Sequence, residues 1–162
     1  MEITQEALKE FLWYDKETGD FYWRKVCTPK MKSWDKAGTI NSRGYVRIKI
    51  FQKIHQAHRL AWLYVYGNLP EQLDHINCNK SDNRIENLRP ATHSTNGMNR
   101  GVQANNKLGF KGVIFHKRDK KFIANIRVLG KQKCLGYFST AEEAHSAYTK
   151  ASGELHGQFS RI

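Results

Sequence analysis

Cysteine is scarce in this sequence, which holds three in 162 residues, at Cys27, Cys78 and Cys134. They lie far apart, their number is odd, and no Cys-x-x-Cys pair occurs. The sequence therefore offers no cysteine pairs for a structural zinc site, and we expect no zinc. A few scattered cysteines also suit a reducing cytosol.

Long hydrophobic segments are also absent. The longest apolar run covers residues 60–66, whereas a membrane-spanning helix needs about 20 residues. Residues 1–6 lack the basic and apolar stretches of a signal peptide. We therefore expect a protein that acts in the cytoplasm and does not enter a membrane.

Acidic side chains are fewer than basic ones. The sequence has 15 Asp and Glu and 27 Lys and Arg, which gives a net charge of +12. Such a balance favours a polyanionic partner, most commonly nucleic acid. The net charge is +4 over residues 1–56, +1 over residues 57–106 and +7 over residues 107–162. The flanks, above all the C-terminal one, therefore supply most of the electrostatic attraction.

What the sequence does contain is an adjacent carboxylate and imidazole, Asp74-His75, after a stretch at 69–73 that predicts a short strand. An Asn-rich loop follows, then Asn87, and then a short polar helix that carries Asn96. This order places a proton acceptor, His75, beside the oxygen ligands Asp74 and Asn96, which suit Mg²⁺ or Mn²⁺. A base beside a divalent metal is what phosphodiester hydrolysis requires.

Other interpretations of this region carry less weight. An EF-hand calcium loop is disfavoured, because glycine is missing at the sharp turn and glutamate is missing at the twelfth position. His58 stands at the start of a predicted helix, where a histidine is more often structural than a ligand. His93 and Asn99 lie one helical turn from Asn96 and are the rival metal ligands.

Residues 57–100 resemble the HNH (His-Me finger) nucleases, and most closely the homing endonucleases of phages and introns. The resemblance implies a ββα-metal core in which His75 is the general base that activates water. It also implies that Asp74 and Asn96 hold one divalent metal on the scissile phosphate and the leaving 3′ oxygen. Asn87 would brace the loop and orient His75. The segments that carry the resemblance are Ala-His-Arg-Leu-Ala-Trp at 57–62, Leu-Asp-His-Ile-Asn at 73–77, Asn-Leu-Arg at 87–89 and Asn-Gly-Met-Asn at 96–99.

Residues 1–56 predict a β-rich region behind a short capped helix. In the strand predicted at 45–50, Arg47 and Lys49 share one face and the apolar residues the other. One face can therefore pack while Arg47 and Lys49 meet DNA phosphates. The predicted elements are a helix over 4–14 and hairpins over 14–24 and 37–50.

Residues 109–162 predict three antiparallel strands followed by one helix, after a polar linker at 101–108. The segment resembles the plant APETALA2-type DNA-binding domain, which lays its sheet into the major groove. The resemblance rests on Gly112-Val113, Ala124-Asn125-Ile126-Arg127, Leu135-Gly136-Tyr137-Phe138 and Ser139-Thr140-Ala141-Glu142-Glu143-Ala144. The predicted strands cover 112–117, 121–128 and 133–138, and the helix begins with a capping box at Ser139 and Glu142, packs through Ala144, Tyr148, Ala151 and Leu155, and ends at Gly157.

Asn125 and Arg127 are the best candidates for reading base edges. Strand alternation places them on the face opposite Ala124 and Ile126. The plant domains usually have an acidic residue where Asn125 stands, an arginine where Ile114 stands and a tryptophan where Cys134 stands, so base preference is not carried over. Phosphate contacts are assigned to further basic residues, namely Lys117, Arg118, Lys131 and Lys133.

Together these patterns predict an α+β protein with a basic β-hairpin N-terminal region, a ββα-metal core and a C-terminal three-stranded antiparallel sheet packed on one helix. We interpret it as a site-selective, metal-dependent DNA endonuclease of the HNH homing type that works as a monomer on double-stranded DNA and nicks one strand. The resemblance implies a phage or mobile element in a bacterial host. The predicted regions are 1–56 (DNA-contacting), 57–100 (nuclease core), 101–108 (linker) and 109–162 (DNA-binding domain).

Two alternatives compete with this interpretation. The chain could be a DNA-binding regulator with a silent nuclease fold, but such a copy has no chemical need for Asp74, His75 and Asn96 together. An RNA-binding or RNA-cutting protein is disfavoured, because the predicted C-terminal sheet lacks an exposed aromatic platform for stacking bases.

Overall fold

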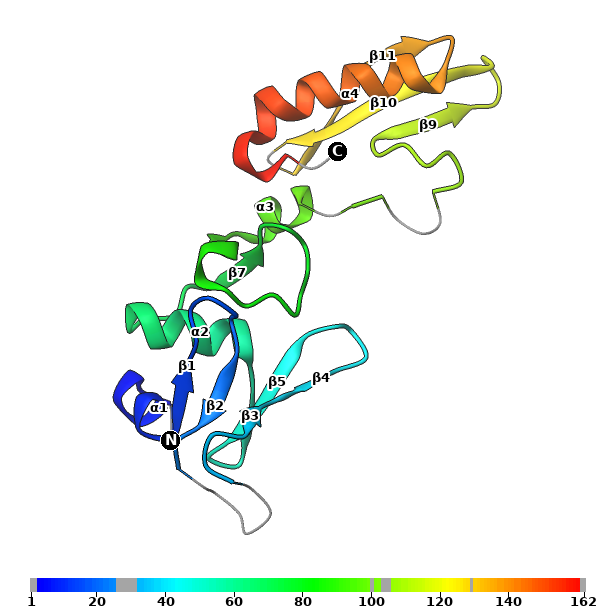
Figure 1. The fold of residues 1–162 in the computed structure, drawn as a ribbon. Helices are drawn as coiled ribbons and strands as arrows, with labels where there is room; N and C mark the ends of the chain where they lie inside the picture. Colours follow the sequence, from blue (N-terminus) through cyan, green and yellow to red (C-terminus); the bar gives the residue numbers. More distant parts are fainter. Residues whose placement is uncertain (1–2, 26–31, 100, 103–105, 129, 161–162) are drawn as a thin grey trace. The chain divides into compact units, whose positions relative to one another are not determined.

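A computed structural model describes residues 3–25, 32–99, 101–102, 106–128 and 130–160. Cys27 lies outside these ranges. The chain forms two compact units, Met1–Ala91 and Thr92–Ile162 (Figure 1). The predicted α+β class is confirmed, since both units combine small antiparallel sheets with helices. Among the described residues no helix has the length and apolar character that a bilayer crossing demands.

The first unit is built from three small antiparallel sheets with the strand orders β1-β2-β3, β4-β5-β6 and β7-β8. Two helices, α1 and α2, pack against each other, and a 3₁₀ turn, η1, precedes β8. Its elements are α1 (Gln5–Phe11), β1 (Leu12–Tyr14), β2 (Phe21–Trp23), β3 (Lys36–Ala37), β4 (Thr39–Ile40), β5 (Val46–Ile50), β6 (Lys53–Gln56), α2 (Ala57–Tyr66), β7 (Gln72–His75), η1 (Ile85–Asn87) and β8 (Leu88–Ala91).

The core of this unit forms where the helices meet the sheets. Thr4 caps α1 by accepting a hydrogen bond from the Ala7 amide at 3.2 Å, as predicted. α2 ends at Gly67, whose left-handed φ of 73° suits a C-terminal glycine. The predicted boundary between residues 56 and 57 falls inside this unit, because α2 packs on both α1 and β5. The fully buried core includes Leu8, Leu12, Phe21, Ile48, Leu60 and Ala61.

The stretch predicted to be the first strand of the second hairpin belongs to two sheets. β3 pairs with β2, whereas β4 pairs with β5, so the chain passes from one sheet to the next at Gly38. Gly38 has a φ of +104°, a conformation that side chains rarely adopt. The alternation predicted for β5 is confirmed, since Arg47 and Lys49 are exposed while Ile48 and Ile50 are buried.

The second unit contains a short helix, α3, and a three-stranded sheet of order β11-β10-β9 that packs on α4. The pairing of β10 with β11 shifts in register between Ala124 and Asn125, so that Leu135 of β11 has no residue directly opposite it. Its elements are α3 (His93–Met98), β9 (Val113–His116), β10 (Lys121–Val128), β11 (Lys131–Phe138), α4 (Ala141–His156) and η2 (Gly157–Phe159).

Two details of α4 differ from the prediction. The capping box uses Thr140 and Glu143, one residue later than predicted, because Thr140 takes the extended N-cap conformation. The buried stripe continues at Ser152, whereas Leu155 is 42% exposed. A strict spacing of four residues from Ala144 keeps this face on the sheet.

Candidate active site

The candidate site is built at the end of β7, where the strand pairs with β8. Asp74 lies opposite Arg89 and His75 opposite Leu88. The Arg89 guanidinium donates two hydrogen bonds to Asp74 Oδ2, at 2.8 and 3.1 Å, and both side chains are buried. β7 therefore includes the Asp-His pair itself, rather than ending before it as predicted.

His75 is buried and its tautomer is set by Asn83. Asn83 donates its side-chain amide to the Ser81 carbonyl at 3.2 Å, so its oxygen faces the imidazole. The distance from His75 Nε2 to Asn83 Oδ1 is 3.3 Å. Because an amide oxygen only accepts hydrogen bonds, Nε2 carries the proton and Nδ1 keeps the lone pair. The geometry therefore designates Nδ1 as the basic atom of this imidazole.

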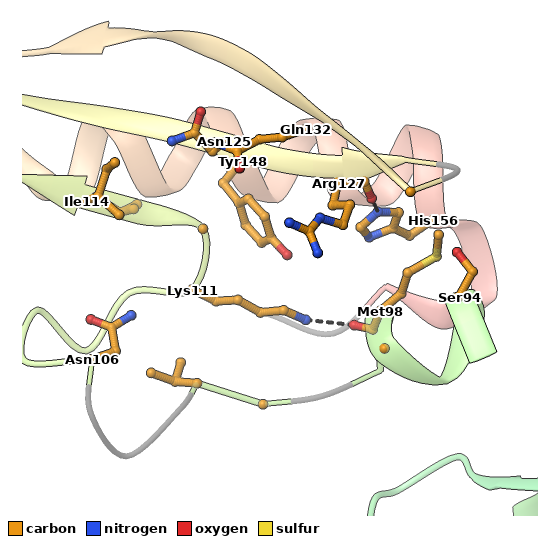
Figure 2. Close-up of a pocket in the computed structure, with 16 residues that line it drawn as sticks. Ser94, Met98, Asn106, Lys111, Ile114, Asn125, Arg127, Gln132, Tyr148 and His156 are labelled. Carbon is orange, nitrogen blue, oxygen red and sulfur yellow. Dashed lines mark hydrogen bonds between the residues drawn. The ribbon is translucent and has the colours of Figure 1, made fainter.

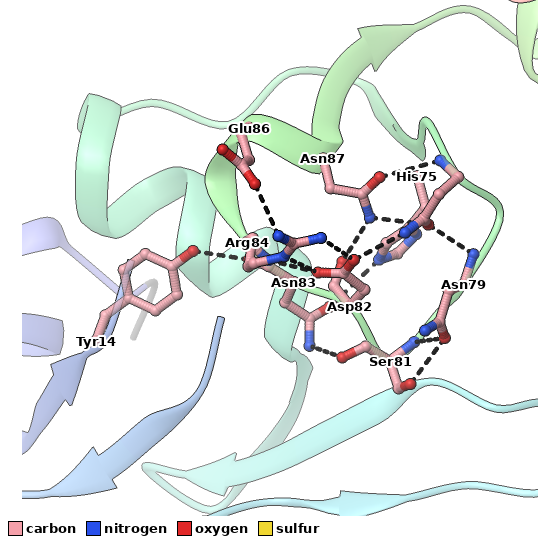
Figure 3. A network of polar contacts seen from close by, with 10 residues as sticks. Tyr14, His75, Asn79, Ser81, Asp82, Asn83, Arg84, Glu86 and Asn87 are labelled. Carbon is pink, nitrogen blue, oxygen red and sulfur yellow. Dashed lines mark hydrogen bonds and ion pairs between the residues drawn. The ribbon is translucent and has the colours of Figure 1, made fainter. Parts of the chain in front are cut away.

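Asn83 is held in place by the N-terminal hairpin. Tyr14 donates its hydroxyl to the Asn83 carbonyl at 2.7 Å, and this bond is buried (Figure 3). Burial raises the pKa of Tyr14, so the phenol stays protonated and keeps donating. The turn after β1 also approaches closely, because a Cβ added to Gly19 would lie 2.4 Å from the Arg84 amide nitrogen.

Asn87 crosses the base of the loop between β7 and η1. Its side-chain oxygen accepts from the Asn77 amide at 3.0 Å. Its amide group donates to Asn77 Oδ1 at 3.0 Å and to the Asp82 carbonyl at 2.8 Å. The backbone carbonyl of Asn87 accepts from Ile76 at 2.8 Å. Three loop residues are thus tied to one buried asparagine.

The loop is closed by a charged cluster around Arg84. Arg84 donates to both carboxylate oxygens of Asp82, at 2.8 and 2.9 Å, and to Glu86 at 2.8 Å (Figure 3). These hydrogen bonds lower the pKa of Asp82 to about 2. Asn77 also donates to Asp82, at 2.8 Å. The Asp82 carboxylate therefore stays ionised at physiological pH and keeps accepting these hydrogen bonds within the loop.

A second histidine packs against the first. The rings of His58 and His75 lie 4.9 Å apart, edge to face, and Tyr45 lies 5.6 Å from His58 and 6.1 Å from His75. Burial lowers the pKa of His58 to about 3, and burial likewise lowers the pKa of His75. For His75 the Asn83 hydrogen bond and the Asp74 charge oppose the shift. Both imidazoles are therefore neutral at physiological pH.

The predicted metal ligands lie in different units. Asp74 belongs to the first unit, whereas Asn96 lies on α3 in the second, so their pairing remains a prediction. A carboxylate offers about four acceptor positions, and the two hydrogen bonds from Arg89 fix the orientation of the Asp74 carboxylate. Among described residues no group of three or more His, Cys, Asp or Glu could hold a metal ion. The predicted pair of Asp74 and Asn96 is not such a group, because asparagine is not one of those four residue types.

The predicted DNA contacts of the second unit fall on two faces of its sheet. Cross-strand partners share a face, so Asn125 and Arg127 lie with Cys134 and Gln132 on the face away from α4. Lys131 and Lys133 pair with Val128 and Ile126, whose face packs on α4. Lys117 and Arg118 are exposed in the turn between β9 and β10.

The face that carries Asn125 also presents aromatic surface. Tyr137 lies opposite Ile123 and is 56% exposed. A single tyrosine is still no platform for successive bases.

A cavity of about 1110 Å³ in the second unit is lined by residues from the sheet, from α4 and from α3 (Figure 2). Asn125, Arg127 and Gln132 line it from the sheet, and Tyr148 lines it from α4. Lys111 crosses its edge and donates to the Met98 carbonyl of α3 at 2.7 Å. This bond supports the C-terminal end of a six-residue helix that is too short to be stable alone.

Comparison with known proteins identifies the class of the protein. A family model described as HNH endonuclease matches residues 55–98, the segment that contains α2, the Asp74-His75 pair, Asn87 and α3. The chain belongs to the HNH endonuclease family, the hydrolases that cut phosphodiester bonds within nucleic acid chains.

Two individual proteins are similar to most of this chain. The chain is 30% identical over 116 residues to Protein 3.8 of Escherichia phage T7, covering 70% of this chain and 95% of that protein. It is also similar to a solved structure of the HNH homing endonuclease I-HmuI, which was determined to describe how that enzyme binds and cleaves DNA. That match has 22% identity and a TM-score of 0.47, and it covers 96% of this chain and 91% of the other.

Sequence reasoning missed Asn83, Tyr14 and Tyr45 as members of the site. The only signal that the sequence carries for Asn83 is its place in an Asn-rich loop after a candidate base. Tyr14 is 69 residues from Asn83, and nothing in the sequence links the two.

Proposed function

We propose that this HNH endonuclease is a site-selective, divalent-metal-dependent DNA endonuclease of the homing type. The observation that carries the proposal is the buried His75, whose Nδ1 holds the lone pair while Asn83 fixes Nε2. A general base must be neutral to accept a proton, and the lowered pKa of His75 meets that requirement.

In the proposed reaction His75 takes a proton from water through Nδ1, and the resulting hydroxide attacks the scissile phosphorus. Asn83 holds the ring so that the same nitrogen always faces the water. Asn87 acts one step away by fixing the loop on which Asn83 stands. The bond to the 3′ oxygen breaks, that oxygen takes up a proton from solvent, and a 5′ phosphate and a 3′ hydroxyl result.

Asp74 and Asn96 would hold one Mg²⁺ or Mn²⁺, because a carboxylate and an amide oxygen are the hard donors that these ions prefer. Such an ion would polarise the scissile phosphate and stabilise negative charge on the leaving oxygen. Arg89 fixes the Asp74 carboxylate by two hydrogen bonds, so the ligand is oriented before any ion arrives.

Double-stranded DNA is the proposed substrate, bound through basic residues on both flanks. The contacts would come from Arg47 and Lys49 in the first unit and from the second unit, where Asn125 and Arg127 would read base edges and Lys117, Arg118, Lys131 and Lys133 would bind phosphates. The net charge of +7 over residues 107–162 supports this division. We place the enzyme, as a monomer that nicks one strand, in the cytoplasm of a phage-infected bacterium.

The test is the cleavage of supercoiled plasmid in Mg²⁺ by the wild type and by His75→Ala. Loss of a general base typically lowers the rate by about 10²–10⁴-fold, while DNA affinity should stay within a few-fold because the flanks supply most binding. His55→Ala, at a half-buried histidine on β6, serves as the matched control. A wild type that binds but never cuts would favour the non-catalytic regulator instead, and a His75→Ala variant that cuts normally would remove His75 from the mechanism.

A further inference from the structure

Lys80 stands on the loop between β7 and η1, beside the proposed base. Its side chain is exposed and extends toward the turn between β4 and β5. The ammonium donates to the Arg43 carbonyl at 3.2 Å and lies 5.0 Å from the centre of the Tyr45 ring. Two contacts from one turn thus hold a flexible side chain in a defined place.

The other cations of this loop and its two strands are neutralised within the protein. Arg89 is paired with Asp74 in the interior, and Arg84 is paired with Asp82 and Glu86. Within the described residues no ion pair includes Lys80. Its contacts are a carbonyl dipole and a π face, neither of which cancels a full charge, so the ammonium can still attract an external anion.

Lys80 is also close to the reacting centre. The Tyr45 ring lies between the two groups, 5.0 Å from the ammonium and 6.1 Å from the His75 ring. These two distances limit the separation of Lys80 and His75 to about 11 Å. One strand of duplex DNA rises about 3.4 Å per phosphate, so this limit corresponds to about three nucleotides.

We propose that Lys80 is a substrate-binding residue that contacts a backbone phosphate of the cleaved strand within about three nucleotides of the scissile bond. The inference rests on the proposed function, because it takes DNA as the substrate. Tyr45 and the Arg43 carbonyl hold the ammonium in position before DNA arrives, which reduces the entropy that binding must overcome. Lys80 would therefore fix the register of the strand beside His75, a role distinct from the general attraction of the flanks.

The first experiment measures binding of a mixed-sequence duplex in EDTA as a function of salt concentration, so no cleavage is needed. Lys80→Ala should lower the slope of log K against log salt by about 0.9, the value for one lost phosphate contact. Lys9→Ala is the matched control, because Lys9 is also exposed and lies 5.5 Å from a tyrosine ring, Tyr64. Its slope should equal that of the wild type, and Lys80→Arg should restore the slope. Equal slopes for Lys80→Ala and the wild type would overturn the proposal.

The second experiment locates the phosphate on duplexes that span the nick made by the wild-type enzyme. One phosphate at a time is replaced by a neutral methylphosphonate, and the cleavage rate is measured for the wild type and Lys80→Ala. One replacement near the nick should slow the wild type and leave Lys80→Ala unaffected. Identical interference patterns for both proteins would refute the contact, whereas a wild type that makes no nick refutes the proposed function and leaves the salt experiment to decide about Lys80.

Discussion

Replacement of His58 by phenylalanine should remove a large part of the acid sensitivity of the first unit. His58 is 5% exposed, its Nδ1 has no hydrogen-bond partner among the described residues, and burial lowers its pKa from 6.5 to about 3. Between these two values the unfolded chain binds a proton at this position and the folded chain does not. The free energy of unfolding must therefore fall as the pH drops through this window.

The size of the effect follows from the same two values. With a pKa of 6.5 in the unfolded state and about 3 in the folded state, His58 contributes a loss of about 2 kcal/mol between pH 7 and pH 5. The lowered pKa of His75 adds to the acid sensitivity with the same sign. The difference between the wild type and His58→Phe isolates the part that belongs to His58.

The assay is urea unfolding at both pH values in EDTA, followed by tryptophan fluorescence. All four tryptophans lie between residues 13 and 62, so this signal reports on the first unit. Leu63→Ala, a buried position on the same helix, is the control: it should lower stability at both pH values by a similar amount and keep the wild-type pH dependence. If His58→Phe loses as much stability from pH 7 to pH 5 as the wild type, His58 is charged in the folded protein and the reasoning fails.

Further outcomes are expected for the site and the flanks. Asp74→Ala and Asn96→Ala should each shift the Mg²⁺ dependence of cleavage to higher concentration, and a metal-bound structure with His93 or Asn99 as ligand instead of Asn96 would refute that choice. Deletion of residues 107–162 should remove most site preference and lower the salt dependence of binding, since +7 of the net charge is lost; unchanged values would refute the assignment. On end-labelled duplex one strand should be cut, because each chain holds a single Asp-His pair; simultaneous cutting of both strands, at a rate that rises with the square of protein concentration, would indicate a dimer.

The sequence predicted local elements well where a local signal exists. The cap at Thr4, the exposed and buried faces of β5 and the end of α4 at Gly157 follow from neighbouring residues. The buried stripe of α4 was partly wrong, because Ala151 and Ser152 are equally compatible with helical spacing and only the sheet selects between them.

The residue types of the candidate site could be predicted from the sequence, whereas the residues that hold them in place could not. The Asp-His pair is visible in the sequence, because two such residues beside each other are unusual. Its tautomer depends on Asn83, and Asn83 depends on Tyr14, which belongs to a hairpin near the N-terminus. Contacts between residues this far apart in the sequence form only when the sheets assemble, and no periodicity or spacing in the sequence indicates them.

The hydrogen bond from Tyr14 to Asn83 has a consequence for how such enzymes can be recombined. A gene exchange that moved residues 57–100 alone would separate Asn83 from the hydroxyl that holds it. The smallest transferable piece of this nuclease therefore begins before β1, and a chimaera built at the motif boundary would inherit the proposed general base, His75, without the tyrosine that holds Asn83 beside it.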